Sequence, residues 1–216
     1  MHGCTMRDNS HPLAQKVALI GANGMLASMV RARAPKDCSL YSFDLPEFDL
    51  TDREQVLDAL TKLTPDVIIN CAAYTNVDGA ETDRDLALCV NGTAVGFLAA
   101  AAKAIDATLV HISTDYVFDG ASPEPYAETD QTNPKSVYGE SKLLGEQSVT
   151  AANLTKYFIV RTSGLYGPGG NNFVETILRL AAEREELRII DDQVGSPTFT
   201  GDLADAIFNL LDIAAN

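Results

Sequence analysis

Short apolar runs alternate with segments of helical periodicity along most of this chain. Six strands are predicted, at residues 17–20, 40–43, 67–70, 109–113, 157–160 and 187–190. The first run is continuously apolar, as expected of a strand that is buried on both faces of a parallel sheet. Helices are predicted between and after these runs, at residues 25–33, 51–63, 83–105, 136–151, 173–185 and 202–211.

The order of these elements decides the fold class. Because strands and helices alternate, the sequence predicts an α/β protein with a doubly wound parallel sheet of Rossmann type. Thr51 and Glu54 have the spacing of a capping box, which places the start of the second helix at Thr51. The Ala-rich segment at residues 83–105 has the clearest helical pattern, and residues 164–170 are expected to form a loop.

A glycine motif joins the first predicted strand to the first predicted helix. Gly21 and Gly24 begin a G-x-x-G-x-x-A pattern that ends at Ala27. Glycines at such a turn let the backbone approach a pyrophosphate at the N-terminus of the following helix. A plain tight turn is the alternative. The motif therefore predicts a dinucleotide-binding turn over Gly21, Asn23, Gly24, Met25 and Leu26.

Asp44 ends the second predicted strand, about 20 positions after the first glycine. A carboxylate at this place hydrogen-bonds the 2′-hydroxyl of an adenosine ribose and so favours NADH over NADPH. No Arg or Lys adjoins it in sequence to hold a 2′-phosphate. An acid exposed on a loop is the alternative. Asp49 and Leu50 are expected near the adenine.

Tyr138 and Lys142 form a Y-x-x-x-K pattern on a predicted helix, which places the two side chains one turn apart. An unperturbed tyrosine has a pKa of about 10, and a lysine charge one turn away is expected to lower that pKa towards neutrality. Thr114 follows the fourth predicted strand and offers a hydroxyl for a substrate oxygen. These residues predict proton transfer to a substrate held by Thr114. A surface Tyr beside a solvated Lys is the alternative.

The composition narrows the choice of partners. The chain has 216 residues, a formal net charge of −14, 46% hydrophobic and 21% charged residues, which is ordinary for a globular protein. The acidic balance argues against nucleic acids and anionic membranes as partners, and no stretch is expected to span a bilayer. The cysteines show no metal-ligand spacing with the histidines, so we expect no metal site and a reduced, cytoplasmic protein.

Three further residues carry weaker signals. Cys71 and His111 lie in apolar runs, which favours buried packing for both side chains. Arg161 leaves the fifth predicted strand, and the sequence leaves open whether it pairs with a carboxylate or with a substrate phosphate.

Five sequence stretches, in this order, resemble the dTDP-4-dehydrorhamnose reductase family of extended short-chain dehydrogenases/reductases. The most specific are S-T-D-Y-V-F-D-G at residues 113–120 and D-D-Q-V-G-S-P-T at residues 191–198. The others lie at residues 65–78, 138–142 and 161–167. Together they cover nearly the whole chain from Lys16 onward.

The resemblance implies an NAD(P)H-dependent reductase of the 4-keto group of a nucleotide-activated 6-deoxy sugar. Tyr138 would protonate the developing alkoxide, Lys142 would tune Tyr138 and bind the nicotinamide ribose, and Thr114 and Asp115 would contact the sugar. The cofactor would be lined by residues 72–75, which are Ala72, Ala73, Tyr74 and Thr75. The resemblance also implies a homodimer, with residues 83–105 at its interface.

The resemblance also implies a division of the chain. Residues 16–163 are expected to be an NAD(P)-binding Rossmann domain, and residues 164–216 the beginning of an incomplete substrate-binding lobe. Residues 1–15 are expected to be a flexible tail because they are polar and lack the apolar core of a signal peptide. Gly164 stands where the family usually carries a tryptophan against the substrate. Two alternatives therefore stay open: a non-catalytic NAD(P)-binding regulatory subunit of the same fold, and a related sugar ketoreductase or epimerase.

Overall fold

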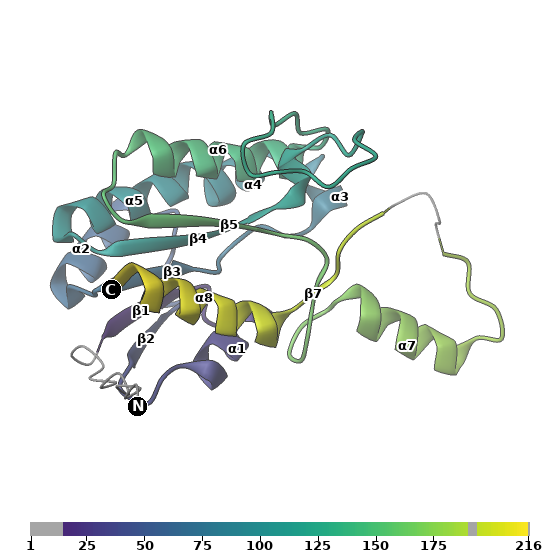
Figure 1. Ribbon diagram of the computed structural model, residues 1–216, viewed down its shortest axis with the longest axis horizontal. Helices are drawn as coiled ribbons and strands as arrows, with labels where there is room; N and C mark the ends of the chain where they lie inside the picture. Colours follow the sequence, from purple (N-terminus) through teal and green to yellow (C-terminus); the bar gives the residue numbers. More distant parts are fainter. Residues whose placement is uncertain (1–14, 190–193, 216) are drawn as a thin grey trace, which may run out of the picture.

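The computed structural model describes residues 15–189 and 194–215, and the predicted tail at residues 1–15 falls almost wholly outside them. Its centre is a parallel sheet in the order β2-β1-β3-β4-β5 (Figure 1). The strands are β1 (Lys16–Ile20), β2 (Ser39–Phe43), β3 (Val67–Asn70), β4 (Thr108–Thr114) and β5 (Tyr157–Thr162). This sheet confirms the predicted doubly wound α/β fold.

Helices cover both faces of the sheet, which explains why the central strands are apolar on both sides (Figure 1). Every residue of β3 is buried. One face packs against α2 (Arg53–Leu63), α5 (Ala94–Ile105) and α6 (Val137–Ala151). The other face packs against α1 (Met25–Arg33) and α8 (Thr200–Ala215). The predicted segment 164–216 therefore includes a helix, α8, that belongs to the packing of the sheet.

The long Ala-rich segment is helical but not uniform. It consists of α4 (Arg84–Leu88), a π-helical turn η1 (Cys89–Thr93) and α5, and the short helix α3 (Val77–Ala80) precedes it without having been predicted. Contrary to expectation, residues Arg84–Ile105 are long and apolar enough to cross a membrane, with a mean hydropathy of 1.5 over 18 residues. A buried core helix meets the same criterion, and α5 packs six buried side chains into the protein.

The N-cap of α2 is Asp52, one residue later than the capping box implied, and the helix begins at Arg53. The carboxylate of Asp52 accepts hydrogen bonds from the backbone N–H groups of Glu54 and Gln55, at 3.0 and 3.1 Å. Thr51 instead donates its hydroxyl to Asp49 over 2.7 Å. The prediction of Thr51 as the cap was therefore wrong, because an aspartate next to it competes for the same backbone donors.

The segment after β5 differs most from expectation. The predicted loop at residues 164–170 contains β6 (Leu165–Tyr166), which pairs in parallel with β7 (Thr198–Phe199). The predicted strand at residues 187–190 was wrong, since residues 187–189 are not in a strand, and Ile190 lies outside the described residues. Helix α7 (Phe173–Glu183) has no buried residue and projects away from the sheet (Figure 1).

Candidate active site

A cleft of about 800 Å³ opens at the carboxyl ends of the parallel strands. The strand order reverses between β1 and β3, and in doubly wound sheets ligands bind outside the strand ends at such a switch point. Most of the predicted site residues line this cleft: Gly21, Gly24, Met25, Leu26, Asp44, Asp49, Leu50, Ala72, Ala73, Thr75, Thr114, Asp115, Tyr138 and Lys142. Asn23 and Tyr74 lie outside this lining.

The glycine turn has the shape that close approach of a ligand requires. Gly21 has a φ of +74°, and a Cβ atom there would lie 2.5 Å from the backbone nitrogen of Ala72, so only glycine fits. Gly24 precedes α1, whose N-terminus has no side-chain cap among the described residues. Ala27 is fully buried, as close packing of this helix on the sheet demands. These features fit the diphosphate of a dinucleotide, which uncapped N–H groups bind well.

Asp44 is held at the edge of this turn by two backbone donors. Its carboxylate accepts from the N–H of Asn23 at 2.7 Å and from that of Leu45 at 2.8 Å. Asn23 thus contributes to the turn through its backbone. Arg31, which was not predicted, donates to the carbonyl oxygen of Ala22 over 2.9 Å. Its position in α1, ten residues from the first glycine of the turn, gave no local motif that sequence reasoning could use.

The predicted trio of Thr114, Tyr138 and Lys142 comes together from β4 and α6. Thr114 is the last residue of β4, and Tyr138 stands in the first turn of α6, where Ser136 caps the helix by accepting from the N–H of Gly139 over 3.1 Å. The hydroxyl of Thr114 lies close enough to the phenol of Tyr138 to influence its pKa, and it donates to the carboxylate of Asp115 over 3.0 Å. Lys142 is buried and donates from Nζ to the carbonyl oxygen of Ile112 over 2.6 Å.

The electrostatics of the pair differ from expectation. Burial raises the pKa of Tyr138 above its usual value, and the nearby charge of Asp115 raises this pKa further, while the hydroxyl of Thr114 lowers it. Burial lowers the pKa of Lys142 to about 8, against the raising effects of Glu146 and Cys71. The prediction that Lys142 lowers the pKa of Tyr138 was therefore wrong for this structure. Desolvation of the phenol is the largest cause of the shift, and the charge of Lys142 is not among its causes.

Asn91 is a further site residue that the sequence did not reveal. It is buried in the π-helical turn, where its Oδ1 accepts from the N–H of Tyr74 at 2.8 Å. Its Nδ2 donates to the carbonyl of Tyr74 at 3.0 Å and to the Ser141 hydroxyl at 2.9 Å. Asn91 thereby joins the predicted cofactor segment at residues 72–75 to the helix of Tyr138. The turn that aims it inward has no sequence signature that we could have used.

The remaining candidates are also placed. Burial lowers the pKa of His111 well below its usual value, and its Nδ1 lies 3.1 Å from the Asn70 amide nitrogen. Cys71 is only partly buried and lines the cleft, and desolvation raises the pKa of its thiol to about 12. Gly164 lines the cleft with a φ of +51°. Within residues 15–189 and 194–215, no group of three or more His, Cys, Asp or Glu side chains is arranged to hold a metal ion.

Arg161 pairs with a carboxylate of the protein itself. Its guanidinium donates twice to Glu146, from Nε to Oε1 over 2.9 Å and from Nη2 to Oε2 over 2.7 Å. Arg161 lies on β5 and Glu146 on α6, so this contact joins the two elements. The bond to Glu146 raises the pKa of Arg161. The sequence left open whether Arg161 pairs with a carboxylate or with a substrate phosphate, and in the structure it pairs with the carboxylate of Glu146.

Comparison with known proteins agrees with this fold and site. The RmlD substrate-binding domain family matches residues 15–216, and the chain belongs to this family. It is 43% identical over 195 residues to the dTDP-4-dehydrorhamnose reductase of Sinorhizobium fredii, covering 90% of this chain and 66% of that protein. It is 40% identical to the Bacillus subtilis spore coat polysaccharide biosynthesis protein SpsK, covering 90% of this chain and 69% of SpsK.

A solved structure gives the same result. The dTDP-4-dehydrorhamnose reductase of Bacillus anthracis in complex with NADP superimposes with a TM-score of 0.90 at 44% identity, covering 93% of this chain and 71% of that one. The family resemblance deduced from the sequence is therefore confirmed. The chain spans about two thirds of the length of the relatives that it matches.

Proposed function

We propose that this chain carries the cofactor site and the proton-transfer residues of an NAD(P)H-dependent reductase, which reduces the 4-keto group of a nucleotide-activated 6-deoxy sugar. The observation that supports it most is the convergence of Thr114, Tyr138 and Lys142 on the cleft that the glycine turn also lines. The names of the relatives from Sinorhizobium and Bacillus anthracis specify dTDP-4-dehydrorhamnose, which we adopt as the substrate.

The glycine turn and the segment after β3 would hold the cofactor. Gly21 and Gly24 would bind its diphosphate, Asp44 its adenosine ribose, and Ala73 and Thr75 its nicotinamide half. When bound, NAD(P)H supplies a hydride to C4 of the sugar. The carboxylate of Asp44 favours NADH, although the relative from Bacillus anthracis has NADP bound.

The protein's own residues would position the ketone and supply the proton. The hydroxyl of Thr114 would donate a hydrogen bond to the ketone oxygen. Tyr138 would then transfer its phenolic proton to that oxygen as the C–O double bond becomes a single bond. A raised pKa suits this direction of reaction, because it keeps Tyr138 protonated at neutral pH. Lys142 would bind the nicotinamide ribose and provide positive charge beneath the phenol.

The test is turnover, followed as loss of NADPH or NADH absorbance with dTDP-4-dehydrorhamnose, beside a direct titration of each cofactor. We expect both cofactor binding and sugar-dependent oxidation from a protein that includes this chain. Tight cofactor binding without turnover would contradict the reductase assignment and favour the non-catalytic regulatory alternative. Turnover only with another nucleotide ketosugar would favour the related ketoreductase. A cytoplasmic location and a homodimer remain predictions of this proposal.

A further inference from the structure

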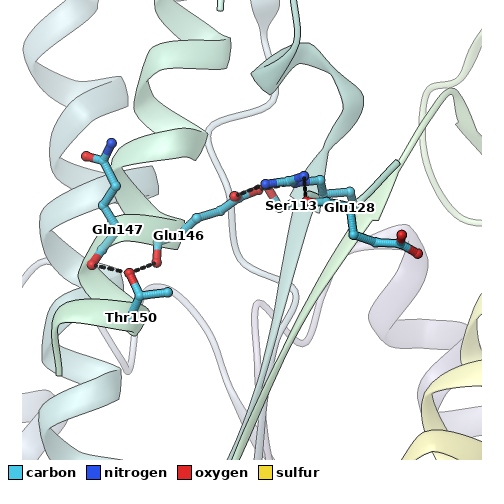
Figure 2. Close-up of polar contacts among 6 residues, drawn as sticks. Ser113, Glu128, Glu146, Gln147 and Thr150 are labelled. Atoms are coloured by element: carbon cyan, nitrogen blue, oxygen red, sulfur yellow. Dashed lines mark hydrogen bonds and ion pairs between the residues drawn. The ribbon is translucent and has the colours of Figure 1, made fainter. Parts of the chain in front are cut away.

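The carboxylate of Glu146 is buried at the centre of three elements that carry the site. Glu146 lies on α6, one turn after Lys142, and its side chain is 6% exposed. It accepts from the Ser113 hydroxyl over 2.5 Å and from Arg161 through two nitrogen atoms. Figure 2 shows the side chain reaching from the helix to the strands. One carboxylate therefore links α6 to the carboxyl ends of β4 and β5.

Arg161 extends this network to the segment between Thr114 and Tyr138. Its Nη1 donates to the carbonyl oxygen of Glu128 over 3.2 Å, and its guanidinium lies 4.9 Å from the ring centre of Phe118. Phe118 stacks in turn on Tyr126 at 4.3 Å. The segment between β4 and α6 therefore contacts the Arg161–Glu146 ion pair through Glu128 and Phe118.

The placement of this pair is hard to explain by stability alone. Taking a charge out of water is costly, so an ion pair whose carboxylate is 6% exposed and whose guanidinium is 23% exposed adds little net stability compared with apolar side chains of similar size. Its two parallel bonds do, however, fix geometry, because the planar guanidinium matches a carboxylate in only a few orientations. A fixed geometry is valuable here, since Ser113 directly precedes Thr114 and Glu146 follows Lys142 by one turn.

We propose that Glu146, held by Arg161 and Ser113, is a positioning residue that fixes Thr114 relative to Tyr138 and maintains the positive charge of Lys142. This inference rests on the proposed reductase function for its catalytic consequence. The effect of Glu146 on the charge of Lys142 does not depend on that function, because this charge can be measured without any substrate.

The groups that face Lys142 make Glu146 the main source of negative charge. Cys71 approaches from the end of β3, but burial keeps its pKa near 12, so the thiol is uncharged at neutral pH. His111 on β4 and Tyr138 on α6 are neutral as well, because burial lowers the pKa of His111 and raises that of Tyr138. Glu146 therefore opposes the loss of the Lys142 proton that burial favours.

The test compares Glu146→Gln with Glu140→Gln. Glu140 lies on the same helix and its only ion pair is an exposed one with Arg84 at 2.7 Å within the described residues, so its variant removes the same charge from the same helix. Lys142 is titrated by NMR of its side-chain amine in the cofactor-free protein. We expect its midpoint to fall below about 8 in Glu146→Gln and to stay unchanged in Glu140→Gln.

The kinetic arm separates positioning from folding. Glu146→Gln is expected to lower kcat by about tenfold to about hundredfold, while the dissociation constant of NADH changes by less than about twofold because Gly21, Gly24 and Asp44 would hold the other half of the cofactor. Because Glu146→Gln leaves Arg161 without its charge partner, the double variant Glu146→Gln/Arg161→Gln is measured beside it. It also removes the unpaired positive charge, so its Lys142 midpoint should fall less than that of Glu146→Gln but stay below that of the unmutated protein.

A Lys142 midpoint that is unchanged in Glu146→Gln and in the double variant would overturn the proposal. So would a kcat equal to that of Glu140→Gln, or a loss of kcat accompanied by an equal loss of cofactor affinity, which a general loosening of the fold produces. If the unmutated protein does not turn over, the proposed function fails. In that case the titration midpoint of Lys142 in Glu146→Gln alone tests the role of Glu146.

Discussion

Lys142 donates its Nζ hydrogen bond to the carbonyl oxygen of Ile112 over 2.6 Å, two residues before Thr114. The lysine therefore stands against the strand beneath the site, one helical turn from Tyr138. Burial at this place lowers its pKa to about 8, so at neutral pH the protein keeps a charged lysine where desolvation disfavours the charge. Such a position is expected of a group that serves function rather than stability.

Replacing Lys142 by methionine should therefore stabilise the cofactor-free protein at pH 7. Below about pH 8 lysine is protonated in both the folded and the unfolded state, and the folded protein bears the full burial cost. We expect Lys142→Met to raise the free energy of unfolding by roughly 1 to 3 kcal/mol there, reduced by the lost bond to Ile112. As pH rises from about 8 towards the unfolded value of 10.5, the folded lysine loses its proton and the gain should shrink.

The measurement is chemical denaturation at pH 7 and at pH 9.5. Lys103→Met is the matched control, because Lys103 also donates to a backbone carbonyl, that of Ala152 at 2.8 Å, but is exposed. Its variant should change the free energy of unfolding by less than about 0.5 kcal/mol at either pH. A Lys142→Met protein that is less stable than the original at pH 7 would show that the bond to Ile112 outweighs the burial cost.

Removing the phenolic oxygen of Tyr138 should abolish proton transfer and leave cofactor binding in place. We expect Tyr138→Phe to lower kcat by about 10²-fold or more, since a positioned proton donor contributes that much. The dissociation constant of NADH should change by less than about threefold, because Gly21, Gly24 and Asp44 would hold the other end of the cofactor. Steady-state kinetics and fluorescence titration of NADH measure the two quantities.

Tyr157→Phe controls for the loss of a tyrosine hydroxyl elsewhere. Tyr157 begins β5 at the opposite end of the sheet and is 39% exposed. Its variant should keep full activity. Turnover that survives undiminished in Tyr138→Phe would refute the assigned proton donor.

The sequence predicts the elements whose causes are local. Residues 17–20 of β1 and 67–69 of β3 are continuous apolar runs, and the bounds of α1 at Met25 and Arg33 follow from the glycine turn before it and Pro35 after it. The glycine turn, the strand end at Thr114 and the Y-x-x-x-K pair suffice to locate the cleft. Such signals depend on neighbours within a few positions.

What could not be predicted depends on residues far apart in sequence. The pairing of β6 with β7 joins Leu165 to Thr198, and strands of two residues leave no periodicity to detect. Arg31 reaches back along α1 to Ala22, and Asn91 reaches Tyr74 from the π-helical turn, and neither contact leaves a motif in the sequence. The raised pKa of Tyr138 has the same origin, since desolvation is set by the packing around the phenol and not by the spacing to Lys142.

The carboxylate of Asp44 should set the preference between the two nicotinamide cofactors. Asp44→Asn keeps a side-chain oxygen for the N–H of Asn23, now at 2.7 Å, but removes the charge that repels a 2′-phosphate. We expect the ratio of NADPH affinity to NADH affinity to rise by about tenfold. Calorimetric titration with both cofactors measures it, and Asp58→Asn, an exposed carboxylate on α2, is the control. A ratio that does not move would make Asp44 a structural residue of the turn only.

Gly21→Ala should weaken the protein and its cofactor binding by more than the backbone strain of the substitution alone. Gly21 and Gly120 share nearly the same left-handed backbone, with φ of +74° and +69°, but their surroundings differ. A Cβ at Gly120 meets no described atom within 4 Å, whereas one at Gly21 would lie 2.5 Å from the backbone nitrogen of Ala72.

Gly120→Ala should therefore show the backbone cost alone, roughly 1 kcal/mol. Gly21→Ala should lose about 1 to 3 kcal/mol more and bind NADH at least about tenfold more weakly, because β1 and the start of the segment after β3 must separate. Denaturation and NADH titration of the two variants measure the difference, and equal losses in both would show that the turn tolerates a side chain against Ala72.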